Sequence, residues 1–286
     1  MRILNAILIA SLLLGINACN IINPSEPTPT YIHIDSFSFK SRDTLGSSSH
    51  RITNVYAYFN NQPVGVFDLP VTFPVIANAP GTLKILPGID FDGLTGYEVN
   101  YPMYTADTLA IIPQPGKTIS FLPKSTYSDG VKIPFLEAFE NGAGKVNSFS
   151  LYAFGDTTIQ TIATPADVFE GHGSGLISLP PGKDSTSIIS TPMNLPYGVN
   201  SYIELDYKGN LPLVVGMSVL LNSGPIYTEY LIALKPQTEY KKIYVGLRDF
   251  VGNNQGVNYQ ILLQTIKPGN VTDGYLFLDN IKVVSF

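Results

Sequence analysis

The sequence lacks the residues that usually stabilise a small exported fold or build a catalytic centre. It has no tryptophan and one cysteine, Cys19, so no disulfide can form within the chain. It has 17 Lys and Arg against 22 Asp and Glu, a formal net charge of −5, and no basic block. Nucleic acid is therefore a poor partner for this chain.

Motifs for catalysis are also missing from the sequence. The three histidines, His33, His50 and His172, are scattered, and none belongs to a His-Glu-x-x-His zinc motif. Phosphate loops and dinucleotide fingerprints are absent, and carboxylates are too sparse to nominate a glycosidase pair. We therefore expect a protein that is not an enzyme.

Turn-forming and aromatic residues are abundant, with 25 Gly, 22 Pro, 17 Tyr and 15 Phe. Short runs of alternating apolar and polar residues recur between Gly and Pro, and no stretch keeps a 3.6-residue apolar period. This pattern predicts an all-β protein. The runs in residues 31–128 predict one β-sandwich, and those in residues 130–286 predict a jelly-roll sandwich.

The N-terminus has the pattern of an export signal. Arg2 precedes an apolar run from Ile3 to Ile16, which is shorter than the about 20 residues that a membrane-spanning helix needs. Ile16-Asn17-Ala18-Cys19 resembles the bacterial lipobox, which implies a signal peptide over residues 1–18 and a lipid on Cys19. The alternative is an ordinary signal peptide followed by an incidental cysteine.

A lipid on Cys19 would anchor the protein in a membrane of the cell envelope. Multiple acyl chains would hold it firmly, because a single chain binds only weakly. The proline-rich residues 19–30 would form an extended tether. We expect the outer membrane as the location, and the sequence leaves open which leaflet the protein occupies.

Both predicted domains resemble known modules. Asn61 to Pro70 and Tyr101 to Tyr104 are similar to a pattern of Bacteroidota-type surface lipoproteins, whose modules are immunoglobulin-like or transthyretin-like. Phe135 to Gly142, Val168 to Ser174 and Tyr275 to Val284 resemble strands of carbohydrate-binding modules with a galactose-binding-like jelly roll. The second resemblance implies a glycan ligand. Because the chain has no Trp, the aromatic ring that stacks on the sugar would have to be that of Tyr or Phe.

Polar side chains share one face of two predicted strands. Tyr202, Glu204 and Asp206 alternate with apolar residues in the first of these strands, and Asn258, Gln260 and Gln264 lie on the polar face of the second. A face that mixes tyrosine with carboxylates and amides can stack on a sugar and hydrogen-bond to it. The alternative is that both faces are simply the solvated sides of antiparallel strands.

The closing strand suggests a structural calcium ion. Asp279 is in phase with Tyr275, Phe277, Ile281 and Val283, and a carboxylate among such residues is costly unless it is paired or metal-bound. The resemblance to jelly rolls places the opening strand beside it, which makes Glu140 and Asp279 the candidate ligands. Hydrogen bonds from backbone amides to Asp279 are the alternative.

We conclude that the sequence favours a lipid-anchored envelope protein that binds a glycan or another surface ligand. A structural or assembly subunit of an envelope complex is the alternative, and a glycan-processing enzyme is a third. A strip of exposed tyrosines favours the first function, a broad apolar patch the second, and facing carboxylates in a cleft the third.

We predict that Cys19→Ser abolishes acyl labelling and releases the protein from membranes of a bacterial host, because the thiol is the only attachment point for the lipid. Metabolic labelling with a fatty acid and membrane fractionation measure this. A variant that stays labelled and sediments with the membranes would rule out the lipobox interpretation.

Overall fold

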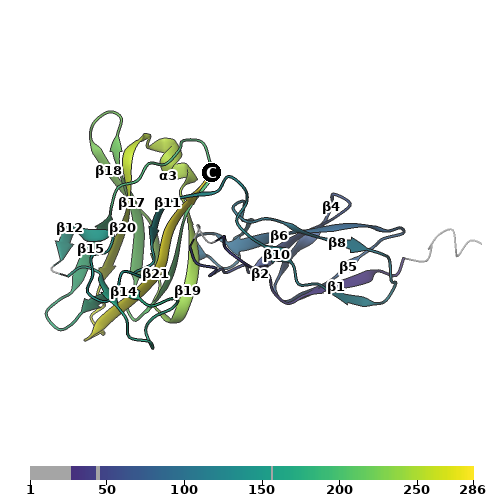
Figure 1. Ribbon diagram of the computed structural model, residues 1–286, viewed down its shortest axis with the longest axis horizontal. Helices are drawn as coiled ribbons and strands as arrows, with labels where there is room; N and C mark the ends of the chain where they lie inside the picture. The colour runs from purple at the N-terminus through teal and green to yellow at the C-terminus, as the bar shows by residue number, and fades with distance from the viewer. Residues whose placement is uncertain (1–26, 43–45, 156) are drawn as a thin grey trace, which may run out of the picture.

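The computed structural model describes residues 27–42, 46–155 and 157–286. Figure 1 shows two β-rich bodies joined end to end, the first in purple to blue and the second mostly in green to yellow. The prediction of an all-β protein with two sandwiches is confirmed. Cys19 lies outside the described residues, so the signal peptide and the lipid stay predictions. Of the residues described, none forms a helix long and apolar enough to cross a membrane.

The first domain packs two small layers of sheet around an apolar core. One layer has the order β5-β1-β9 beside the pair β10-β2, and the other has the order β4-β3-β6-β7 with β8 also on β6. Its elements are β1 Thr30–Ile34, β2 Ser38–Phe39, β3 Asn54–Phe59, β4 Gln62–Asp68, β5 Val71–Val75, β6 Gly81–Asp90, η2 Phe91–Gly93, β7 Glu98–Asn100, β8 Asp107–Ile111, β9 Thr118–Ser120 and β10 Lys124–Ser125.

Local sequence explains the hairpin between β3 and β4. Val55 and Ala57 are buried and alternate with tyrosines that are partly exposed, as expected for a half-buried strand. The turn residues Asn60 and Asn61 have φ values of 50° and 65°, a conformation that asparagine tolerates better than most residues. Two such residues reverse the chain and place Phe59 opposite Gln62.

The second domain is a larger sandwich of two sheets. The six-stranded sheet has the order β13-β14-β21-β16-β19 with β11 also on β21, and the five-stranded sheet has the order β12-β15-β20-β17-β18. Its elements are β11 Lys132–Glu137, β12 Phe149–Gly155, β13 Gln160–Ile162, β14 Ser174–Leu179, β15 Ser185–Ser190, β16 Ser201–Gly209, β17 Leu213–Leu221, β18 Ile226–Leu234, β19 Gln237–Gly246, α3 Arg248–Asn253, β20 Gly256–Ile266 and β21 Gly274–Ser285.

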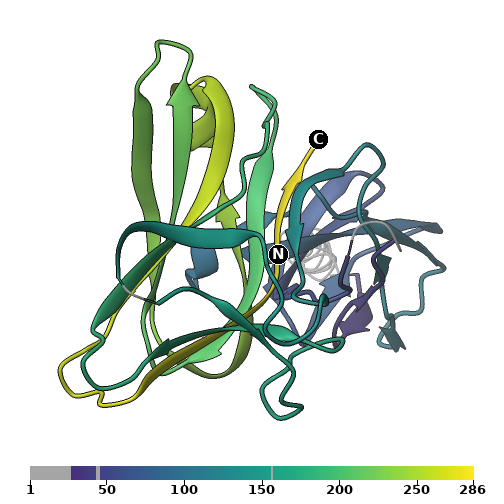
Figure 2. The same ribbon diagram turned by 60° about the vertical axis from the view of Figure 1, so that its left-hand side comes forward.

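The two sheets bury a continuous core between them. Ile203 and Leu205 of β16 face this core from one sheet, and Ile261 and Leu263 of β20 face it from the other. Their neighbours in sequence, which include Glu204 and Leu262, therefore point to the outer faces of the sandwich. Figure 2 shows the yellow β21 running the length of this domain and passing beside the first domain.

One bulge changes the predicted phase of β21. Asp206 pairs with Asp279 while Glu204 pairs with Lys282, so β21 carries one extra residue here, and Asn280 has a φ of 49°. Phe277 and Asp279 consequently face outward, whereas Ile281 and Val283 belong to the core. The prediction that these residues share one face is wrong, because the bulge reverses the alternation after Asp279.

A third apolar cluster joins the domains to each other. Tyr101, Tyr104 and Tyr127 of the first domain pack with Tyr244 and Val284 of the second. Tyrosine rings dominate this contact; the centroids of Tyr101 and Tyr244, for example, are 4.8 Å apart. The two sandwiches therefore share buried surface in addition to the linker between them.

Candidate functional site

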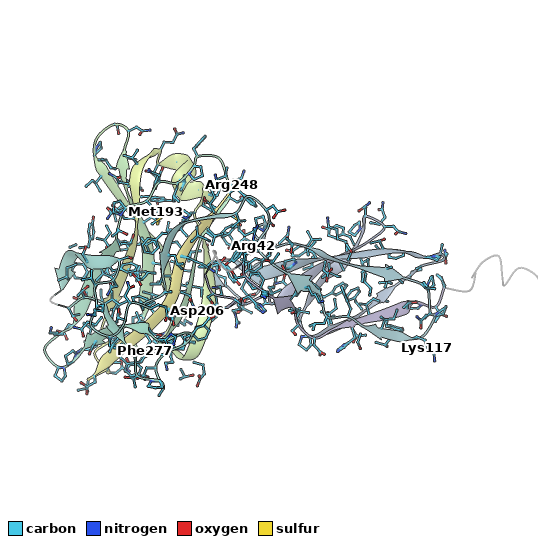
Figure 3. The ribbon with its side chains drawn as sticks, viewed as in Figure 1. Arg42, Lys117, Met193, Asp206, Arg248 and Phe277 are labelled. Atoms are coloured by element: carbon cyan, nitrogen blue, oxygen red, sulfur yellow. The ribbon has the colours of Figure 1, made fainter. Side chains whose placement is uncertain are left out.

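Tyr202, Glu204 and Asp206 share the outer face of β16, as predicted, but this face is closed to solvent. The exposed fractions of Glu204 and Asp206 are 0% and 1%, and Tyr202 is also buried. Both interpretations offered from the sequence required an exposed face, so both are wrong for these three residues. The physical reason is that the first domain packs over this part of β16, near the junction where Figure 3 labels Asp206.

Glu204 is the centre of a buried charge cluster at the junction. Its carboxylate accepts hydrogen bonds from the hydroxyls of Tyr101 at 2.7 Å and Tyr127 at 2.9 Å, both from the first domain. The Nζ atoms of Lys242 and Lys282 lie 3.1 Å and 3.6 Å from Glu204 Oε2. Burial raises the pKa of a carboxyl group, but the two ammonium groups and the two hydroxyls hold the pKa of Glu204 below its ordinary value.

Asp206 completes the charge cluster. Its carboxylate lies 3.7 Å from Lys242 Nζ and accepts a hydrogen bond of 2.8 Å from Ser49 Oγ of the first domain. Burial raises the pKa of Asp206, an effect that Lys242 partly offsets. Two carboxylates thus face two ammonium groups, and hydroxyl groups of the first domain donate hydrogen bonds to both oxygens of Glu204 and to Oδ1 of Asp206. The cluster joins the domains and leaves no exposed group for a ligand.

Glu140 and Asp279, the predicted calcium ligands, bind different partners in the structure. Glu140 accepts hydrogen bonds from the backbone N–H of His172 and lies 3.2 Å from its ring Nδ1. Asp279 accepts hydrogen bonds from Ser174 Oγ at 2.9 Å and from the backbone N–H groups of Glu170 and Asn280 at 3.3 Å and 2.7 Å. In the described part of the chain, no three His, Cys, Asp or Glu side chains lie close enough together to hold a metal ion. Calcium binding stays a prediction.

Gln260 and Gln264 lie on the outer face of β20, in the five-stranded sheet, whereas Asn258 lies at a bulge, with a φ of 56° and one extra residue in β20 between the partners of Ser218 and Leu220. Asn258 is exposed, and the two glutamines are half-buried. Gln260 is fixed by a hydrogen bond of 2.6 Å from its Nε2 to the carbonyl oxygen of Ser190. We call the outer face of this sheet the β20 face. Its residues are Tyr152, Ser187, Ile189, Gly216, Ser218, Thr228, Tyr230, Gln260, Leu262 and Gln264.

The β20 face is strongly curved. Tyr152 and Thr228 belong to β12 and β18, the two edge strands of the sheet, which would lie roughly 19 Å apart if five strands formed a flat sheet. The Tyr152 hydroxyl is nevertheless 3.2 Å from Thr228 Oγ1. The face must therefore curve toward itself, and β12 assists because it leaves its register with β15 between Leu151 and Gly155.

The centre of the β20 face combines small, apolar and aromatic residues. Tyr230, Gly216 and Leu262 are register partners across three adjacent strands. A Cβ at Gly216 would lie 2.5 Å from the carbonyl oxygen of Glu229, so only glycine fits there. The Tyr230 side chain borders this position and has an exposed fraction of 52%. Leu262 and Gly216 are themselves buried, so Tyr230 is the accessible residue of this row, and the amides of Gln260 and Gln264 flank Leu262 along β20.

The sequence alone did not identify Tyr152 and Tyr230 as members of this face. Tyr230 lies next to the register shift between Val215 and Gly216, and such irregularities hide the two-residue period. Tyr152 and Thr228 meet only because the sheet curves. The alternation in residues 258–264 was the single available signal.

Comparisons with known proteins find similar structures only. Neither a family model nor a curated protein matches the chain. The chain is similar to the CBM22-1 xylan-binding domain of Paenibacillus barcinonensis Xyn10C, with 11% identity, a TM-score of 0.40, and coverage of 55% of this chain and 97% of that one. It is similar to TmCBM61 in complex with β-1,4-galactotriose, with 13% identity, a TM-score of 0.35, and coverage of 51% and 92%. It is also similar to the enzymatically active domain of tailspike protein 4 of bacteriophage CBA120, with 12% identity, a TM-score of 0.41, and coverage of 59% and 25%.

We predict that Glu204→Ala lowers the free energy of unfolding by about 3–5 kcal/mol, because Lys242 and Lys282 would stay buried without their shared carboxylate. Denaturant unfolding of the full chain measures this. Glu239→Ala, the same substitution at an exposed position of β19, is the control and should change the stability little. Equal effects of the two variants would contradict the role given to the charge cluster.

We predict that Asp279 makes stability fall as the pH rises from about 4 to about 7. Burial raises the pKa of Asp279 from 3.8 to about 7. In this window the folded protein keeps a proton on Asp279 that the unfolded chain has released. The contribution of this proton to stability is therefore complete below the pKa of Asp279 in the unfolded chain, and it is lost as the pH rises toward the pKa in the folded protein. The denaturation midpoint of Asp279→Asn should vary less with pH than that of the wild type.

Asp273→Asn, at an exposed position just before β21, is the control for this titration and should follow the wild type. The series is run once with a chelator and once with calcium. Calcium bound to Asp279 would favour the ionised carboxylate, so that stability would rise with pH instead of falling. Parallel curves for the wild type and Asp279→Asn would show that Asp279 does not titrate in this window.

Proposed function

We propose that this protein binds glycans without catalysing a reaction, through the β20 face, and that a lipid on Cys19 holds it at the cell envelope. The observation that carries the proposal is the curved β20 face, on which the exposed Tyr230 ring adjoins the side-chain-free position of Gly216. The envelope location rests on the N-terminal sequence pattern alone.

The chemistry of the β20 face suits a sugar. A pyranose ring presents C–H groups that pack on an aromatic ring and hydroxyl groups that need donors and acceptors at its edge. Tyr230 supplies the ring, and the amides of Gln260 and Gln264, together with the exposed amide of Asn258 near the start of the same strand, supply both kinds of hydrogen-bonding group. The curvature shown by Tyr152 and Thr228 would let contacts reach a ligand from both edges of the sheet.

The enzyme alternative gains little from the buried carboxylates. Asp206 and Asp279 are register partners on β16 and β21, and both are buried. Each accepts a hydrogen bond from a serine, Ser49 for Asp206 and Ser174 for Asp279. Glycoside hydrolysis requires two carboxyl groups that reach a sugar, and these two face protein groups instead.

The structural alternative, a subunit of an envelope complex, is favoured by the charge cluster. Glu204 and Asp206 bind donors from the first domain, which gives the chain one extended arrangement. Such rigidity suits a spacer in an assembly, and it is compatible with a glycan site on the second domain.

We predict that Tyr230→Ala weakens glycan binding about tenfold, the equivalent of about 1.4 kcal/mol, because it removes the ring on which the sugar packs. Calorimetry of the full chain with xylohexaose, mannohexaose and β-1,4-galactotriose measures this. Tyr230→Phe keeps the ring and should bind normally, and Tyr197→Ala removes a similarly exposed tyrosine outside the β20 face. Binding that is indifferent to Tyr230→Ala would place the glycan elsewhere, and a wild-type chain that binds no glycan would favour the structural alternative.

A further inference from the structure

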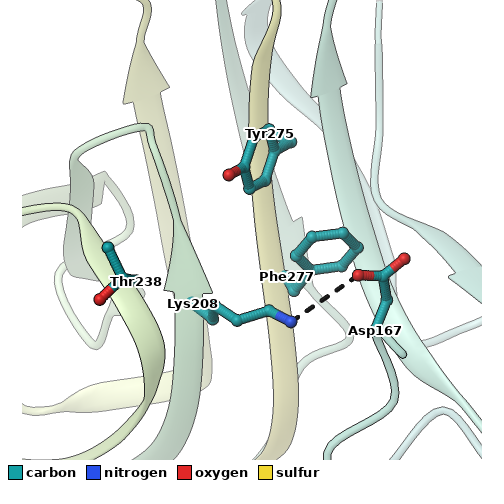
Figure 4. Close-up of a pocket in the computed structure, with 5 residues that line it drawn as sticks. All are labelled: Asp167, Lys208, Thr238, Tyr275 and Phe277. Atoms are coloured by element: carbon teal, nitrogen blue, oxygen red, sulfur yellow. Dashed lines mark ion pairs between the residues drawn. The ribbon is translucent and has the colours of Figure 1, made fainter. Parts of the chain in front are cut away.

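A second concave site lies on the opposite sheet of the second domain. It is a pocket of about 310 Å³ lined by Asp167, Lys208, Thr238, Tyr275 and Phe277. Figure 4 shows the Lys208 side chain crossing the pocket toward Asp167, with the rings of Tyr275 and Phe277 beside it. We call this site the Lys208 pocket. It lies on the outer face of the six-stranded sheet, farther along β16 than the part covered by the first domain.

Aromatic rings and a charge pair fix the Lys208 side chain. Its Nζ atom is 5.0 Å from the ring centroids of both Tyr240 and Phe277 and 3.7 Å from Asp167 Oδ1. It also donates a hydrogen bond of 3.4 Å to the carbonyl oxygen of Ala166. The ammonium group therefore has a defined position before any ligand arrives, which lowers the entropic cost of binding.

The loop that carries Asp167 is also held in place. The Tyr240 hydroxyl donates a hydrogen bond of 2.7 Å to the backbone carbonyl of Asp167. The Asp167 side chain keeps a relative accessibility of 34%, so its carboxylate can still accept hydrogen bonds from outside the protein. One fixed donor and one fixed acceptor thus lie side by side at the pocket wall.

Tyr275 gives the pocket an accessible aromatic surface. Its exposed fraction is 43%, and its ring centroid lies 5.6 Å from that of Phe277, which is buried. The contacts that hold the loop around Asp167 come from Lys208 and Tyr240, not from the Tyr275 hydroxyl. The exposed part of the Tyr275 ring is therefore available to a ligand. The charges of Lys208 and Asp167 cancel, which favours a neutral polar ligand over an ion.

We propose that the Lys208 pocket binds one neutral sugar residue, which packs on Tyr275 while its hydroxyls bind Asp167 and Lys208. The pairing of a ring surface with a fixed donor and acceptor meets the two needs of a pyranose. The proposal deepens the proposed glycan-binding function and rests on it, because it gives the protein a second glycan subsite.

The two sites lie on opposite outer faces of the sandwich, so one straight oligosaccharide cannot occupy both. Two chains, or two branches of one glycan, would be needed. A surface that presents many sugars would then be bound with avidity, because the second binding event takes place at a high effective concentration.

Amide chemical shifts of the full chain, titrated with the methyl glycosides of glucose, galactose, mannose and xylose, test the proposal. We expect shifts at residues 208 and 275–277. Tyr275→Ala should weaken this binding at least about tenfold, and Tyr275→Phe should leave it within about twofold, since the ring does the packing. Asp167→Asn should weaken it as well, and Tyr197→Ala is the control.

The pattern of chemical shifts and variants distinguishes the two sites from each other. Shifts at the Lys208 pocket that vanish in Tyr275→Ala and persist in Tyr230→Ala support the proposal, and they support it even if the β20 face stays silent. Shifts confined to residues 258–264 and unchanged in Tyr275→Ala overturn it while the proposed function stands. Glucuronic acid that binds the pocket about tenfold more tightly than the neutral sugars overturns the ligand class. No shift anywhere overturns both.

Discussion

The buried carboxylate of Glu204 is the constraint on which the arrangement of the molecule depends. A charge without water is costly unless opposite charges and donors surround it. Two of its partners, Lys242 and Lys282, come from its own sheet, and two, Tyr101 and Tyr127, come from the first domain. Any displacement of the first domain would leave this charge short of donors. The cluster therefore selects one docking geometry, whatever its net contribution to stability.

This docking decides which surfaces of the second domain remain for ligands. The first domain covers the outer face of β16 around Glu204 and Asp206. The far end of the same sheet stays accessible at the Lys208 pocket, and the β20 face on the other sheet is free of the junction. The polar residues that looked most like a binding face in the sequence are thus used between domains, and the accessible sites lie away from them.

Sequence patterns predicted the faces of strands and could not predict what covers them. The alternation in residues 201–207 correctly placed Tyr202, Glu204 and Asp206 together, but burial by a distant segment leaves no local trace. In β20, Tyr259 and Ile261 face the core and Gln260 lies on the opposite face, but a bulge at Asn258, where φ is 56°, interrupts the alternation before this point. For Asp279 the prediction from the two-residue period was wrong, because the bulge at Asn280, which has a positive φ, reverses the alternation of side chains along β21. The Lys208 pocket joins three strands and a loop, so its residues are unrelated in the sequence.

The direction in which the first domain extends gives the tether hypothesis a geometric consequence. The backbone N–H of Tyr31 in β1 binds the carbonyl oxygen of Lys117, which Figure 3 labels at the end of the first domain farthest from the junction. The chain therefore enters the first domain at the end opposite the second domain. With a lipid on Cys19, the first domain would act as a spacer, and the charge cluster would fix the second domain at its far end. Both proposed glycan sites would then lie on the domain farther from the anchored end of the chain.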